Sequence, residues 1–306
     1  MAMLVLCGAA GCAGDAGDVS TRGSTQAGAE ILFDDFEYAG RQQMSESGWI
    51  IRTEIGWPGV RGATWPAENV SITNDLQQPG NHLLRMTAST DGDGRNTRQS
   101  QVCHQRKYRE GTYAARVRFS DAPVHGPDGD QVVETFYAIS PLNAPLDPDY
   151  SEMDNEYLPN GGWDGPDRSF YVTTWETAQL EPWIADNASD DFQGSQSGWR
   201  TLVIQVGDGL VRYYLDGRKL ASHGGAYYPE VPMSINFNLW FIQDGLLPSA
   251  ELREYSQDID WVFFRAGTVL RPTEVEASVA AFRKAAVGFR DTVRPTMPSL
   301  PSPCNF

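Results

Sequence analysis

The chain is poor in basic residues. Its 306 residues include 24 Lys and Arg against 40 Asp and Glu, which gives a formal net charge of −16 with histidine neutral. Nucleic acids and anionic membranes bind basic clusters, and no basic stripe offsets this charge. The shortage argues against both partners and favours a neutral or weakly charged one.

Motifs for several common chemistries are also missing. The sequence has no Gly-x-Ser-x-Gly elbow and no phosphate-binding loop. Its histidines show no metal-ligand spacing, and they are His82, His104, His125 and His223. These absences argue against serine-hydrolase, nucleotide and histidine-based metal sites.

The N-terminal apolar run is too short for a transmembrane helix. Residues 1–11 have the small-residue end of an export signal but no basic region before it. Ala9-Ala10-Gly11-Cys12 resembles a bacterial lipobox, which makes Cys12 a candidate for lipidation and membrane attachment. The alternative is a plain signal remnant behind a mis-called start codon. We expect residues 1–29 to be this signal and a flexible tether, and the protein to be secreted or at the cell surface.

Cysteine is scarce, with four residues in the whole chain. If Cys7 is removed with the signal and Cys12 is lipidated, Cys103 and Cys304 remain. An oxidising compartment would permit a disulfide between them, which would tie the C-terminal tail to the body. The alternative is a buried Cys103 and a free Cys304 in a frayed tail.

No long helical period and no internal repeat appear between residues 31 and 267. Turn signals separate short strand-like runs, in a chain with 30 Gly and 19 Pro. This pattern predicts an all-β domain over residues 30–267, built as a two-sheet antiparallel sandwich or jelly roll. Strands are expected at 69–72, 82–88, 112–119, 132–139, 170–175, 201–206, 211–215, 233–240 and 259–265.

Helix is expected only in the C-terminal segment, residues 268–306. Thr273 and Glu276 form a capping box after Pro272. The apolar residues that then fall on one face are Val275, Val279, Phe282, Ala286 and Phe289. We expect this α-helix to pack on the outside of the sandwich and the proline-rich tail from Arg294 to be irregular.

One short stretch, residues 151–157, places three carboxylates at alternate positions. In a β-strand Glu152, Asp154 and Glu156 project from one face. A row of like charges is repulsive unless something binds there or the carboxylates share protons. Two glutamates at this spacing can bring their carboxyls to about 5–6 Å, and a retaining glycosidase needs about 5–5.5 Å. The alternative is a calcium-binding or merely solvated acidic strand.

The carboxylate row and the order of the strands resemble glycoside hydrolase family 16. Glu152-Met153-Asp154-Asn155-Glu156 is similar to the family's signature Glu-x-Asp-x-Glu. Further similar segments follow the family's order: Leu32-Phe33-Asp34-Asp35-Phe36, then residues 108–117, 199–217, 233–240 and 258–262. The resemblance covers most of residues 31–267 and implies a concanavalin A-like jelly roll.

The resemblance also implies the chemistry. Glu152 would be the nucleophile, Glu156 the general acid/base and Asp154 the residue that tunes their protonation. Independently of the family, three carboxylates on one face cannot all ionise cheaply, so one keeps its proton and can act as an acid.

The implied activity is that of an exported, retaining endo-glycosidase on a β-glucan or galactan, which acts as a monomer and needs no cofactor. A lectin-like binding protein and a transglycosylase are the alternatives on this fold.

Aromatic side chains are candidates for holding the sugar. Trp163 follows the signature through a Pro-Asn-Gly-Gly turn and is expected at the cleft edge, and Trp175 lies on a nearby strand, although either could be core. Trp57 and Trp65 could line the cleft from a loop near the start. Asp260 resembles a position that binds a structural calcium in some family members, with a surface aspartate as the alternative.

Overall fold

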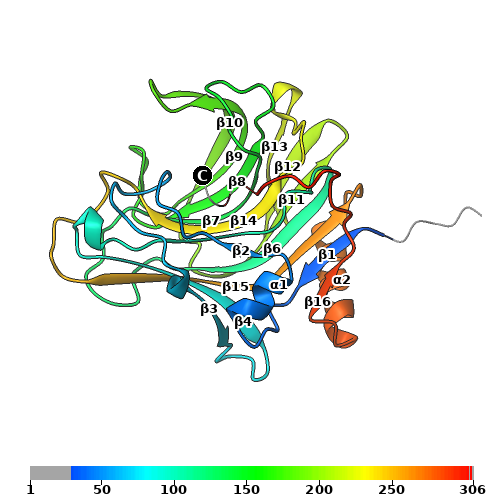
Figure 1. Ribbon diagram of the computed structural model, residues 1–306, viewed down its shortest axis with the longest axis horizontal. Coiled ribbons are helices and arrows are strands. Elements are labelled where there is room, and N and C mark those ends of the chain that lie inside the picture. Colours follow the sequence, from blue (N-terminus) through cyan, green and yellow to red (C-terminus); the bar gives the residue numbers. More distant parts are fainter. Residues whose placement is uncertain (1–28, 303, 305–306) are drawn as a thin grey trace, which may run out of the picture.

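The computed structural model describes residues 29–302 and 304, which form two stacked antiparallel sheets (Figure 1). The predicted two-sheet sandwich is therefore confirmed. The predicted export signal, the candidate lipidation site Cys12 and nearly all of the predicted tether lie outside the described residues.

The first sheet has seven strands, in the order β10-β9-β8-β7-β14-β5-β2. In chain order their bounds are β2 (Ile50–Ile51), β5 (Ser100–Cys103), β7 (Val132–Ile139), β8 (Glu152–Leu158), β9 (Ser169–Gln179), β10 (Ile184–Gln193) and β14 (Ser234–Phe241). The acidic strand β8 lies between β7 and β9, so both of its edges are hydrogen-bonded.

The second sheet has nine strands and contains β15, the longest strand among the described residues. Its members are β1 (Ile31–Asp34), β3 (Val70–Asn74), β4 (His82–Thr90), β6 (Gly111–Phe119), β11 (Gly198–Gly207), β12 (Leu210–Leu215), β13 (Arg218–Gly224), β15 (Arg253–Ala266) and β16 (Phe289–Asp291).

Alternation along the strands separates core from surface. On β8, Met153 and Tyr157 are fully buried in the core between the two sheets. The stacked rings of Phe136 and Phe237, with centroids 5.3 Å apart, extend this core under the neighbouring strands. Since successive residues point to opposite faces, the even-numbered carboxylates of β8 are left on the outer face of the seven-stranded sheet.

The C-terminal helix α2 (Pro272–Lys284) packs on the outer face of the nine-stranded sheet, as expected (Figure 1). Val275 and Val279 are buried there, and Phe282 stacks on Phe33 with ring centroids 4.7 Å apart. Among the described residues no helix is long and apolar enough to span a membrane.

The expected helix ends were wrong. Because Pro272 occupies the first helical position, the preceding Arg271 is the N-cap, and its backbone N–H donates to Glu274 Oε2 at 2.7 Å. The predicted box of Thr273 and Glu276 is therefore displaced. The helix stops at Lys284, and Phe289 belongs to strand β16, which pairs with β1.

Several elements were not predicted. They are the short helix α1 (Arg41–Glu46), the 3-10 turns η1 (Ala67–Asn69), η2 (Gly94–Asn96) and η3 (Gly225–Tyr227), and strands β2, β5, β10, β13 and β16. The sequence of β10 is polar and lacks the apolar alternation that predicts a strand, because its side chains are mostly exposed at the sheet edge.

Cys103 and Cys304 form a disulfide with their Cα atoms 5.5 Å apart. The predicted pairing is confirmed, and the alternative of a free Cys304 is wrong. The bond fixes the end of the proline-rich tail beside β5, so the C-terminal segment is joined to the sandwich through α2, β16 and the disulfide.

Candidate active site

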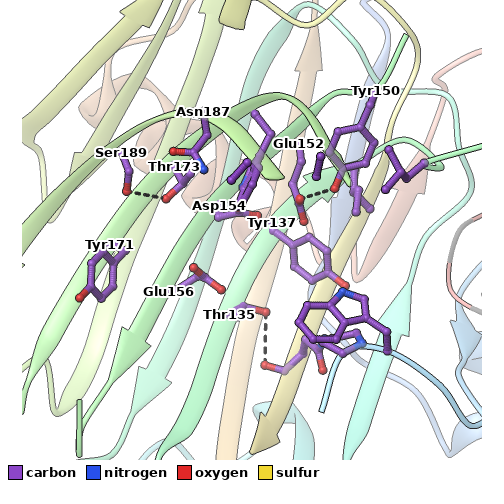
Figure 2. A pocket seen from close by; sticks show the side chains of 18 of the residues that line it. Thr135, Tyr137, Tyr150, Glu152, Asp154, Glu156, Tyr171, Thr173, Asn187 and Ser189 are labelled. Atoms are coloured by element: carbon purple, nitrogen blue, oxygen red, sulfur yellow. Dashed lines mark hydrogen bonds between the residues drawn. The ribbon is translucent and has the colours of Figure 1, made fainter. Parts of the chain in front are cut away.

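The three carboxylates of β8 line one pocket of about 690 Å³ (Figure 2). Glu152, Asp154 and Glu156 follow one another along β8 and form one row of carboxylates, and each has its own pair of neighbours on the adjacent strands. Their cross-strand neighbours on β7 and β9 are, in order, Ile139 and Trp175, Tyr137 and Thr173, and Thr135 and Tyr171. The predicted common face is therefore present, and it faces a cavity within the usual ligand-binding range of about 300–1,000 Å³.

Hydrogen-bond donors are distributed unevenly along this row. The Tyr150 hydroxyl donates to Glu152 Oε2, as Figure 2 shows. Trp175 Nε1 donates to Asp154 Oδ2 at 2.8 Å. Among the described residues no donor reaches the Glu156 carboxyl. Because donors stabilise a carboxylate anion, negative charge is favoured at Glu152 over Glu156.

Burial and mutual repulsion keep protons on the row. Burial raises the pKa of Glu152 to about 7, against the lowering effect of the Tyr150 bond. Burial, and then the charge on Glu152, raise the pKa of Glu156 to about 8. Burial and the charges of both glutamates raise the pKa of Asp154 well above its usual range, despite the Trp175 bond. At neutral pH the row therefore contains both an ionising carboxyl and a protonated one.

Three of the four candidate tryptophans contribute to the pocket. Trp163, Trp175 and Trp57 line it, and Trp163 and Trp57 are half exposed. Trp65 does not: it is only 1% exposed and packs beneath the Arg52 guanidinium, whose carbon lies 3.9 Å from the ring centroid. The expectation that Trp65 lines the cleft was wrong, because the ring is buried in a cluster with Val133, Leu158 and Trp240 beneath Arg52.

Sequence reasoning missed other pocket residues. Tyr150, Tyr137, Trp183 and Trp240 all line the pocket. Tyr150 stands two residues before Glu152, so in an extended chain the two side chains point to the same face. This signal was available in the sequence. Trp183 carried no such signal, because its position depends on the turn that joins β9 to β10.

The expected calcium ligand does not fit a cation site. Asp260 is fully buried, and its carboxylate accepts from Arg283 Nη2 and Arg116 Nη1, each at 2.7 Å, and from Asn81 Nδ2 at 2.9 Å. Two guanidinium groups neutralise this carboxylate and would repel Ca²⁺. Both the calcium and the surface-aspartate readings were therefore wrong. Within residues 29–302 and 304 no cluster of three or more His, Cys, Asp or Glu could hold a metal ion.

Comparison with known proteins finds similarity in structure only. No protein-family model and no curated protein sequence matches the chain. A glycoside hydrolase family 16 endo-glucanase from Bacteroides ovatus is 15% identical with a TM-score of 0.56, and the match covers 75% of this chain and 98% of that one.

Two further solved structures are similar to the same extent. Porphyranase B from Zobellia galactanivorans is 14% identical with a TM-score of 0.57 and covers 79% of this chain and 95% of its own. The Bacillus licheniformis β-glucanase is 15% identical with a TM-score of 0.52 and covers 77% and 97%. The chain thus has the jelly-roll fold of glycoside hydrolase family 16 structures.

Proposed function

We propose that the protein is a retaining endo-glycosidase that hydrolyses a β-linked polysaccharide. The observation that carries this proposal is the row of Glu152, Asp154 and Glu156 at the floor of an aromatic-lined pocket. A lectin gains nothing from three buried carboxylates that raise one another's pKa, whereas a retaining glycosidase needs one carboxylate and one carboxylic acid side by side.

In this proposal Glu152 attacks the anomeric carbon while Glu156 protonates the departing glycosidic oxygen. The Tyr150 hydroxyl helps to hold Glu152 ionised and oriented for attack. Glu156 then removes a proton from water, which hydrolyses the glycosyl-enzyme and restores both groups. The raised pKa of Glu156, about 8, suits the acid role because the group stays protonated at neutral pH.

Asp154 lies between the two reacting groups and is positioned by the Trp175 indole. We propose that it supports the exchange of protons along the row. Asp154→Asn should therefore lower activity and move the pH optimum without abolishing turnover, since both glutamates remain.

The proposed substrate class is a β-glucan or a galactan. Solved structures of the same fold include a β-glucanase and a porphyranase, so the choice between glycans needs experiment. Release of reducing sugar should be screened over β-glucans, agar, carrageenan and plant galactans.

Azide rescue tests the roles of the two glutamates. Glu152→Ala should abolish hydrolysis of an activated glycoside, and azide in the vacated space should yield a glycosyl azide of inverted configuration. Glu156→Ala should still form the glycosyl-enzyme from a substrate whose leaving group needs no protonation. Azide should then give the product of retained configuration.

Other outcomes would contradict the proposal. If both glutamate variants hydrolysed the parent's polysaccharide at near-parental rates, the catalytic assignment would fail. Glycan binding without cleavage by the parent would instead support a binding protein, and transfer to sugar acceptors would support a transglycosylase.

We also propose export to the cell exterior or surface, with lipidation of Cys12 as the anchor. The apolar N-terminal run and the Cys103–Cys304 disulfide support it, because disulfides persist in oxidising compartments. Cell fractionation of the full chain and of Cys12→Ser tests the anchor: the variant should move from the membrane to the soluble fraction.

A further inference from the structure

Two tryptophans from opposite edges of the seven-stranded sheet meet over the pocket. Trp57 lies in the loop after edge strand β2, and Trp183 lies in the turn before edge strand β10. Their ring centroids are 6.4 Å apart, and both line the pocket. Because the floor strands β8, β7 and β14 lie between these edges, the contact spans the cleft.

The contact belongs to a continuous run of five indoles. Trp183 touches Trp175 on β9, with centroids 6.1 Å apart. On the other side Trp57 touches Trp240 on β14, and Trp240 touches Trp163, each pair with centroids 6.3 Å apart. The run therefore passes from the floor beside Glu152, over the cleft, and back to the floor.

The Trp57 side of the contact is anchored by Arg52. The Arg52 guanidinium donates to the Trp57 carbonyl at 3.0 Å and to the Glu54 carbonyl at 2.9 Å. Arg52 is itself buried against Trp65 and donates to Gln101 Oε1 at 2.9 Å. A buried cation with several acceptors holds the loop in one place over the sheet.

The Trp183 side is anchored by its own turn. Gln179 Nε2 donates to the carbonyls of Glu181 at 3.3 Å and Pro182 at 3.1 Å. Trp175, on which Trp183 rests, is fixed by its bond to Asp154. Trp57 and Trp183 are nevertheless 54% and 56% exposed, so both present free ring surface to a ligand.

We propose that Trp57 and Trp183 form an aromatic bridge that retains a bound glycan and makes the enzyme cut several times in each binding event. The inference rests on the proposed function and deepens it. A glycan in an open cleft can leave sideways, whereas one beneath a bridge must slide along its own axis unless the bridge opens. Flat ring surfaces favour sliding because they bind sugar without fixed hydrogen bonds.

The test uses the full chain and the polysaccharide that the parent cleaves. Loss of viscosity is measured against the number of reducing ends formed, together with the share of reducing ends in soluble products. Trp57→Ala and Trp183→Ala should each raise the viscosity loss per reducing end several-fold and lower the soluble share, because cleavage becomes more random.

Trp163→Ala is the matched control, because Trp163 is also a half-exposed pocket indole but does not join the two edges. It should weaken binding and leave the product pattern unchanged. The bridge is refuted if neither bridge variant changes the pattern, or if Trp163→Ala changes it equally.

A second measurement separates failure of the bridge from failure of the proposed function. If the parent cleaves no glycan, the proposed function fails, and near-ultraviolet circular dichroism of the Trp57→Ala, Trp183→Ala and double variants then tests the contact. A contacting pair gives non-additive spectral changes, whereas Trp163→Ala combined with Trp183→Ala should add. Additive changes for Trp57 and Trp183 overturn the bridge.

Discussion

At the scale of single residues, the site is organised by where hydrogen-bond donors are placed. Three chemically similar carboxylates stand in one row, yet Glu152 receives a tyrosine donor, Asp154 receives an indole donor and, within the described residues, Glu156 receives none. Differences in donor supply, added to shared burial, are enough to give the two glutamates different protonation behaviour.

Tyr150→Phe should move the acidic limb of the kcat/KM profile to higher pH. Loss of a hydrogen bond to a charged group costs about 1.5–3 kcal/mol, which is about 1–2 pKa units on Glu152. The sign follows because the lost donor stabilised the ionised form. Tyr171→Phe is the control, since Tyr171 borders the pocket beside Glu156 and should leave that limb in place. An unmoved limb in Tyr150→Phe would contradict the positioning role.

Glu156→Gln should stabilise the fold more at high pH than at low pH. Its pKa is raised from 4.5 to about 8, so the native state binds the extra proton between these values. The stabilisation of the native state by this tighter proton binding is complete below pH 4.5 and is lost as the pH rises towards 8. The glutamine side chain of the variant stays neutral, so the variant does not lose it. Thermal unfolding of the variant and the parent at pH 5 and pH 8.5 should show that the variant's gain in Tm is larger at pH 8.5. Each kcal/mol of added unfolding free energy raises Tm by about 2–4 °C. An equal gain at both values would exclude ionisation as the cause.

At the scale of elements, buried charge decides how the helix α2 is attached. Arg283 near its end donates to Asp35 and to Asp260, both of which are buried. Arg271 at its start pairs with Glu274 at 2.8 Å in an exposed position. Two arginines on one helix thus make ion pairs in opposite environments.

Arg283→Met should destabilise the protein by on the order of 3 kcal/mol, because it removes a partner from two buried carboxylates. Arg271→Met should change stability by less than about 1 kcal/mol, as exposed ion pairs do. Urea denaturation of both variants measures the difference. Similar effects of the two substitutions would show that burial of the Arg283 cluster does not control its contribution.

At the scale of the whole molecule, the disulfide joins residues separated by 201 positions. It links β5, which pairs with the floor strand β14, to the C-terminal tail, so we expect the tail to contribute to global stability. Arg106 adds to this attachment. Its backbone pairs with Leu300 of the tail in an isolated β-bridge, and its side chain donates to the Pro232 carbonyl, just before β14, at 2.7 Å.

Cys304→Ser should lower the free energy of unfolding by about 2–5 kcal/mol, because the unfolded chain gains freedom when a long loop is opened. The urea midpoint of the parent in reductant should match that of the variant in or out of reductant. If the midpoint of Cys304→Ser equals that of the oxidised parent, the released tail only frays and the disulfide does not stabilise the sandwich.

Much of the site followed from local sequence. Alternation in residues 152–156 fixes which side chains share a face, because the side-chain period of a strand is two wherever the strand lies. The shared face, the sandwich class, the packing side of the C-terminal helix and the pairing of Cys103 with Cys304 were predicted and are present in the structure.

What the sequence left open depends on contacts between distant segments. Trp57 and Trp65 stand in one loop with the same chemistry, and only tertiary packing distinguishes them: Trp65 is buried beneath Arg52 in an apolar cluster, whereas Trp57 lines the pocket. Asp260 alternates on its strand as expected, but arginines from β6 and α2 turn it into a buried ion pair. The bridge of Trp57 and Trp183 likewise exists only because the loop after β2 and the turn before β10 meet in the folded chain, which no local period encodes.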